Sequence, residues 1–193
     1  MKKLSAFFLA SVLAAGVSTL RAQDTVYEID PVHSTVLAKV THLGLSTVWV
    51  RFNGPTGTVT VNEADPSKSS INVEVKADGL DSAQEKRDQH LKSPDFFNAK
   101  EFPVITFKST GVKKTGDKTY EATGNLTVHG VTKPVTATFT AIGTGKGAKG
   151  ETRAGADATF TIKRGDFGVG TTFPAAAISE DVGLQISLEA VKK

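Results

Sequence analysis

The stretch VTATFTA, from Val135 to Ala141, alternates apolar residues with threonines without a break. Successive side chains of a β-strand point to opposite faces, so this spacing predicts a strand with one apolar and one polar face. The stretch from Ala154 to Ile162 repeats the pattern with alanine, phenylalanine and isoleucine at the apolar positions. Strands of this kind are typical of an antiparallel sheet that is covered on one side and wetted on the other.

The same alternation recurs along the chain and predicts eight or nine strands. Their approximate ranges are 36–42, 48–52, 59–61, 71–77, 105–107, 126–128, 135–141, 154–162 and 182–190. Turn-forming residues separate neighbouring ranges, which favours antiparallel pairing. We therefore predict an all-β fold, an antiparallel eight-stranded β-barrel, because closure removes the unpaired edges of a sheet. An open sandwich is the alternative.

One segment, around residues 82–98, lacks the strand pattern. Ser82 followed three positions later by a glutamate resembles a capping box, so we predict a helix over about residues 83–92. The serine–proline pair at 93–94 predicts the start of a second short helix. The two phenylalanines that follow it would pack on the barrel.

The first 22 residues have the pattern of a secretory signal peptide. Two lysines precede an apolar run from Leu4 to Val17, and a short segment ends at Ala22. The apolar run is too short to span a bilayer core of about 30 Å. We predict cleavage near Ala22 and one mature domain, residues 23–193, which is exported to the periplasm without a membrane anchor.

Export changes the charge balance of the chain. Residues 1–22 hold three of the 23 basic residues and none of the 20 acidic ones, so the mature chain has zero formal charge. Such a chain offers nothing that favours nucleic acid as a partner. The absence of cysteine excludes disulfides and thiolate metal sites, and the histidines at positions 33, 42, 90 and 129 lack metal-ligand spacing. We predict neither a metal nor another cofactor.

The motif GKGAKG, residues 145–150, matches the glycine pattern of dinucleotide-binding loops. That motif must open a helix, whereas here it lies between two predicted strands, so we interpret it as a hairpin loop. The sequence contains no nucleophile-elbow or zinc-protease motif. No catalytic residue is therefore assigned.

The predicted inner faces are rich in alanine. An eight-stranded barrel either fills its interior with its own side chains or holds one small ligand. Two interpretations stay open: small residues that pack under a flattened barrel, and a long apolar cavity for a lipid-like molecule. In the second case the lining candidates are Val36, Ala38, Val40, His42, Val73, Val75, Ile105, Phe107, Ala137, Phe139, Ala156, Ala158 and Phe160.

Four polar residues are candidates for contact with the head group of such a ligand: His42, Arg87, His90 and Arg164. His42 ends the apolar face of its strand, whereas His33, nine positions earlier, lies on the opposite face and is predicted to be structural or solvated. Arg87 and His90 share a helix face. They either bond to a loop and tie the helix down, or contact the polar end of the ligand.

Several long motifs resemble the YceI-like family of exported lipid-binding proteins. They are YEIDPVHSTV from Tyr27, VTHLGLSTV from Val40, RDQHLKSPDFF from Arg87, LTVHGVTKPV from Leu126 and RGDFGVG from Arg164. The resemblance covers the whole mature chain. It implies a lipocalin-like barrel whose apolar lumen binds an isoprenoid quinone or a polyprenyl phosphate, in a protein that is often periplasmic and often a homodimer.

The function that we expect is an exported, soluble binding protein that holds an isoprenoid lipid for storage, transport or stress protection. Burial of the apolar chain would supply affinity at roughly 25 cal/mol per Å². One alternative is an enzyme that acts on the same lipid, which needs an acid–base pair in the lumen. The other is a solid barrel whose outer face binds a protein partner.

Overall fold

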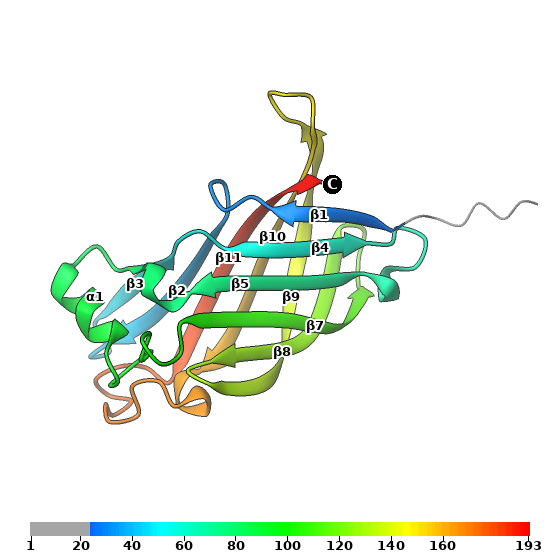
Figure 1. The fold of residues 1–193 in the computed structure, drawn as a ribbon. Coiled ribbons are helices and arrows are strands. Elements are labelled where there is room, and N and C mark those ends of the chain that lie inside the picture. The colour runs from blue at the N-terminus through cyan, green and yellow to red at the C-terminus, as the bar shows by residue number, and fades with distance from the viewer. Residues whose placement is uncertain (1–23) are drawn as a thin grey trace, which may run out of the picture.

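The computed structural model describes residues 24–193 and is built almost entirely of β-strands (Figure 1). The predicted signal peptide lies outside the described residues. The strands are β1 (Thr25–Ile29), β2 (Thr35–His42), β3 (Ser46–Phe52), β4 (Thr56–Val61), β5 (Ser70–Lys76), β6 (Leu80–Asp81), β7 (Val104–Lys114), β8 (Thr119–Val128), β9 (Val131–Lys146), β10 (Thr152–Lys163) and β11 (Asp181–Lys192). The helices are α1 (Glu85–Lys92) and the 3-10 turns η1 (Pro66–Lys68), η2 (Ala77–Gly79) and η3 (Arg164–Phe167).

Eight of these strands close into a ring in the order β1-β4-β5-β7-β8-β9-β10-β11, and β11 pairs with β1. Every pairing within the ring is antiparallel. The prediction of an eight-stranded antiparallel barrel is confirmed, and the open sandwich is wrong. The short strand β1 was missing from the predicted set, although its Tyr27 and Ile29 are buried on one face.

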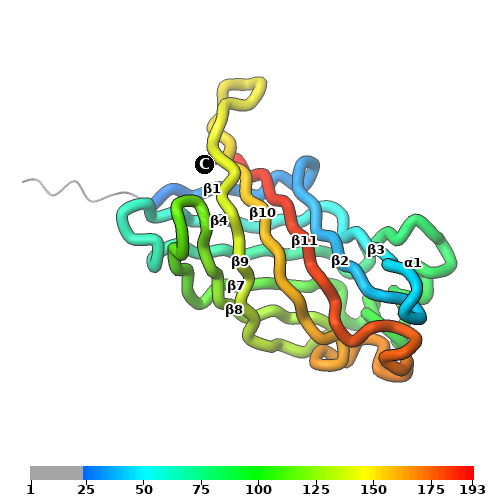
Figure 2. Tube along the Cα trace, turned by 180° about the vertical axis from the view of Figure 1, so that it is seen from behind, coloured from blue at the N-terminus to red at the C-terminus, as the bar shows by residue number. Residues whose placement is uncertain are grey.

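Strand β11 is long enough to pair with two strands on the same side. Its C-terminal end pairs with β1, through Tyr27 and Lys192, and its N-terminal half pairs with β2, from Ser187 to Gly183. Strands β2, β3 and β6 then continue the wall beyond the closed ring, toward α1 (Figure 2). The barrel is therefore elongated at the α1 end.

The helix begins later than the capping box predicts. Gln84 is the N-cap, and its side chain accepts a hydrogen bond from the Arg87 amide at 2.6 Å. Ser82 instead contacts the Asp88 carboxylate through its amide, at 2.8 Å, and its hydroxyl. The capping-box assignment is wrong because Ala83, with φ of 61°, turns the backbone between Ser82 and the helix.

The predicted second helix is also wrong: residues 93–97 form turns, not a helix. The phenylalanines of that segment nevertheless pack on the barrel as expected, since Phe96 is buried and Phe97 lies against the core cluster that contains Phe52. Within residues 24–193, no helix has both the length and the apolar character needed to cross a membrane.

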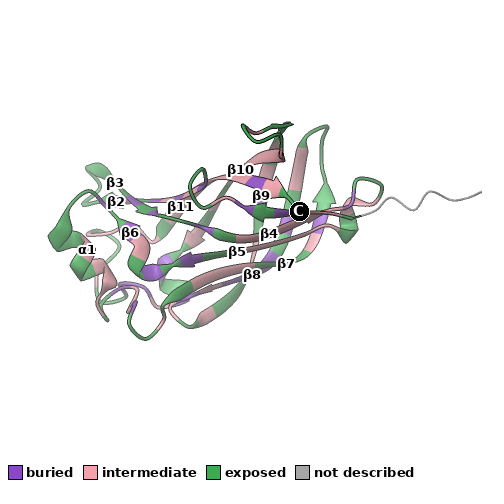
Figure 3. Cartoon of the chain, turned by 45° about the horizontal axis from the view of Figure 1, so that its top comes forward, coloured by how far each residue is buried: buried purple, intermediate pink, exposed green. Residues whose placement is uncertain are grey.

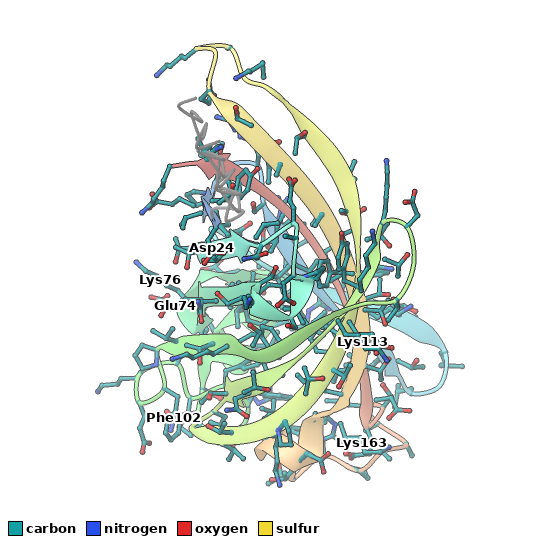
Figure 4. All side chains as sticks on the ribbon, turned by 90° about the vertical axis from the view of Figure 1, so that its right-hand side faces the viewer. Asp24, Glu74, Lys76, Phe102, Lys113 and Lys163 are labelled. Carbon is teal, nitrogen blue, oxygen red and sulfur yellow. The ribbon has the colours of Figure 1, made fainter. Side chains whose placement is uncertain are left out.

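The long strands alternate covered and exposed residues, as the sequence pattern predicts (Figure 3). On β9, Thr136, Thr138 and Thr140 are exposed, whereas Ala137 between them is buried. On β5, the exposed Glu74 and Lys76 alternate with inner-face residues (Figure 4). The inner faces meet around the axis of the barrel, where the candidate site lies.

Candidate functional site

The barrel encloses a long cavity of about 540 Å³. Its wall is made by the apolar faces of all eight ring strands together with β2 and β3. Many lining side chains on β5, β7, β10 and β11 are only partly buried although they face inward, because the lumen itself leaves them accessible. The structure therefore supports the second interpretation of the alanine-rich faces, a long apolar cavity, and not a solid core of packed small residues.

The cavity is closed at the α1 end by aromatic packing. The rings of Phe52 and Phe97 meet edge to face, with centroids 5.4 Å apart, and Phe167 is 2% exposed. The loop after η3 folds over this end and is held by Arg164, whose side chain lines the cavity and is 4% exposed. We call this closed end the floor of the cavity, and the loop after η3 the floor loop.

The opposite end of the cavity reaches solvent. Of its lining residues only Glu63, Lys114 and Asp157 are exposed. Glu63 follows the end of β4 and Lys114 ends β7, both at this end, whereas Asp157 lies midway along β10. Strand β5 pairs with β7 only as far as Asn72 and Lys108, and the register of β7 on β8 then shifts at Ser109/Gly111. A β-bulge of this kind bends a strand, so the end of β7 separates from β5 and leaves a mouth.

Comparison with known proteins agrees with this architecture. Residues 27–190 match the family described as YceI-like domain. The chain belongs to this family. Protein YceI of Salmonella arizonae is 40% identical over 194 residues, and the alignment covers 100% of this chain and 98% of that protein.

Two solved structures show the same YceI-like barrel. A YceI protein of Campylobacter jejuni superposes with a TM-score of 0.72 at 30% identity, covering 79% of this chain and 90% of that one. A polyisoprenoid binding domain from Saccharophagus degradans superposes with a TM-score of 0.66 at 13% identity, covering 86% of this chain and 98% of that one. The second likeness is one of fold alone.

Most lining candidates lie together on the cavity wall of this YceI-like barrel. They are Val36, Ala38, Val73, Val75, Ile105, Phe107, Ala137, Phe139, Ala156, Ala158 and Phe160. Val40 and His42 do not line the cavity, and placing them there is wrong. Strand β2 pairs with β11 only as far as Lys39, so its last residues run past the cavity, and His42 is exposed.

The structure does not bring the four head-group candidates together at the mouth. Arg87 bonds to Ser82, from Nε to the hydroxyl at 2.8 Å and from Nη2 to the carbonyl at 2.5 Å. His90 contacts the Asp95 carboxylate at 2.9 Å, and neither residue lines the cavity. Tying the helix down is therefore the interpretation that the contacts support.

Arg164 lines the cavity, but its donors are occupied. They bond to the carbonyls of Val169, Gly170, Phe173, Ile178 and Ser179 and to the carboxylate of Glu180. The side chain thus holds the floor loop in place from within, and none of its donors is left for a head group.

An ionic cluster lies where the ring closes, outside the cavity. Arg153 on β10 bonds through Nη1 to Asp30 at 2.7 Å and to Glu189 at 2.5 Å, and His33 contacts Asp30 at 2.8 Å. Asp30, His33 and Glu189 place potential metal ligands within 4.8 Å of one another. The Arg153 guanidinium already supplies the positive charge between the two carboxylates, so a cation would have to displace it.

Asp30→Asn is expected to weaken this closure in a pH-dependent way. The hydrogen bonds from His33 and Arg153 hold the pKa of Asp30 well below its ordinary value. Because this pKa is lower in the folded than in the unfolded protein, the ionised carboxylate stabilises the fold at pH values above the unfolded-state pKa, near 3.8. That stabilisation is lost as the pH falls from there through the folded-state pKa. Urea unfolding should show a loss of about 1 kcal/mol at pH 7 that shrinks below pH ~4. A loss that is the same at both pH values would contradict this role.

Sequence reasoning missed the mouth residues Lys114 and Tyr120. A signal was available: Val112 and Lys114 share one face of β7, and Tyr120 and Ala122 share one face of β8. These alternations place a lysine and a tyrosine on otherwise apolar inner faces.

Proposed function

We propose that this protein is a non-enzymatic carrier that holds an isoprenoid lipid in the barrel lumen. The observation that carries the proposal is the cavity of about 540 Å³ with an almost wholly apolar wall. Its volume lies within the range of roughly 300–1,000 Å³ that is typical of small-molecule sites. An apolar cavity is poorly filled by water, because water there finds few hydrogen-bond partners. A flexible hydrocarbon chain suits both the elongated shape of the cavity and its apolar wall.

A protein with the same barrel fold, the polyisoprenoid binding domain from Saccharophagus degradans, supports the same ligand class. An enzyme acting on the lipid would need a general acid–base pair within reach of the reacting group. The long middle of the lumen offers alanine, valine, leucine, isoleucine and phenylalanine side chains instead. Binding is therefore the function that these residues favour, with export to the periplasm and a role in storage or transport as parts of the proposal.

Native mass spectrometry of protein expressed with its leader and purified without detergent tests the proposal. We expect a bound species whose mass, after organic extraction, is that of a molecule with repeating five-carbon units. Delipidated protein should then take up an added isoprenoid quinone or polyprenyl phosphate at one molecule per chain. Protein that carries no lipid and binds neither compound would contradict the carrier function and would favour the adaptor alternative. The same spectra report whether the chain is a homodimer.

A further inference from the structure

The mouth of the cavity carries two hydrogen-bond donors that face each other across neighbouring strands. Lys114, the last residue of β7, is the register partner of Tyr120 on β8. Both side chains line the cavity, and each continues a face whose next inner residue, Val112 or Ala122, is buried in the wall. The pair therefore belongs to the inner surface of the barrel.

The surroundings of this pair place it at the boundary between lumen and solvent. Lys114 is exposed and Tyr120 is partly buried. The Tyr120 ring stacks on Phe139, with centroids 5.1 Å apart and an interplanar angle of 10°, which fixes the ring against the wall. Figure 4 views the barrel from this end, with the neighbouring Lys113 on the same hairpin. A chain lying in the lumen would bring its polar end here, because the other end of the cavity is closed.

Both donors are available to a ligand. Within residues 24–193, Lys114 forms no ion pair within 4.0 Å, and neither its ammonium nor the Tyr120 hydroxyl has a hydrogen-bond partner in the protein. Glu63, the carboxylate that also lines this end, is not paired with Lys114. An ammonium carries three donors and no acceptor, so the group that satisfies it best is an anionic oxygen.

We propose that Lys114 and Tyr120 bind a phosphate head group at the mouth while the isoprenoid chain fills the lumen behind them. The proposal rests on the carrier function and adds the head-group class and its location. Charge-assisted bonds to phosphate are stronger than those to a neutral oxygen, and the phosphate stays partly in water, where its charge is tolerated. The lumen thus selects for an apolar chain, and Lys114 and Tyr120 select for a phosphate head group.

Equilibrium dialysis of geranylgeranyl phosphate and geranylgeraniol, which share one chain, tests this site. Wild-type protein should bind the phosphate about tenfold more tightly than the alcohol, and Lys114→Met should remove most of that difference. Lys114→Arg should restore it, and Tyr120→Phe should reduce it about threefold. Lys113→Met is the matched control, because this lysine is the exposed neighbour of Lys114 on the outer face, and it should change neither affinity.

The results separate the head-group site from the carrier function. Equal affinity for phosphate and alcohol in the wild type, or an unchanged difference in Lys114→Met, would overturn the head-group site while leaving lumen binding intact. Failure of the wild type to bind either compound would overturn both proposals. Raising the salt concentration should weaken binding of the phosphate and leave binding of the alcohol unchanged.

Discussion

Ala156→Phe should strongly weaken lipid binding while leaving the barrel folded. Ala156 lies midway along β10, between its register partners Ala141 on β9 and Leu188 on β11, and all three line the cavity. A phenyl ring at this position would occupy the lumen and block the path of the chain. We expect affinity for an isoprenoid to fall at least about tenfold, which corresponds to about 1.4 kcal/mol.

The stability of the same variant distinguishes a cavity from a packed core. An added ring that enters open space buries apolar surface without displacing other side chains, so the free energy of unfolding should stay within about 1 kcal/mol of the wild type. In a filled barrel the ring would force its neighbours apart and cost about 1–3 kcal/mol. Urea unfolding monitored by circular dichroism gives this value.

Thr159→Phe is the matched control for this experiment. Thr159 lies on the same strand but is exposed, and its register partners Thr138 and Gln185 are exposed as well. This variant adds the same ring to the outer surface and should bind lipid like the wild type. Equal loss of binding in both variants would show that the ring acts on the fold and not on the lumen.

The alternation of apolar and polar residues was sufficient to predict the barrel and most of its lining. The residues of β10 illustrate this: spacing alone predicts that Ala156, Ala158 and Phe160 lie on the inner face, and all three line the cavity. Spacing defines a face because strand geometry is local and regular. It holds wherever the strand stays within the ring.

Spacing does not show where a face leaves the ring, which is why His42 was misplaced. The apolar face of β2 is continuous in sequence, but its pairing with β11 stops at Lys39. The open end of the cavity was equally hidden, because it depends on where β7 parts from β5, after Lys108, and on the aromatic packing around Phe167. These are non-local contacts, and no local pattern encodes them.

Arg164 is a second case in which local sequence could not reveal the role. Its bonding partners are spread over residues 169–180, a loop with no strand pattern that folds back over the side chain. A planar guanidinium with five donors can satisfy several carbonyls at once. Arg164 thus holds the floor loop together through its hydrogen bonds. Of the substitutions considered for this protein, replacing Arg164 should lower the free energy of unfolding most.

Arg164→Met is expected to lower the free energy of unfolding by about 3–5 kcal/mol, because it leaves buried carbonyls and the Glu180 carboxylate without their donor. Arg164→Lys keeps the charge but not the fork of donors, so it should recover only part of the loss. Lys163→Met is the matched control: Lys163 is the exposed neighbour, paired with Asp181 at 3.0 Å, and its loss should leave stability unchanged within error.

Hydrogen exchange locates the effect of Arg164→Met within the molecule. The amides of Arg164 and Val169, which bond to the Glu180 and Arg164 carbonyls at 2.9 and 3.1 Å, should lose protection first, because the floor loop opens when its centre is removed. Amides in the β8–β9 ladder should keep theirs until global unfolding. A variant as stable as the wild type, with the floor loop still protected, would show that aromatic packing around Phe167 alone closes this end of the barrel.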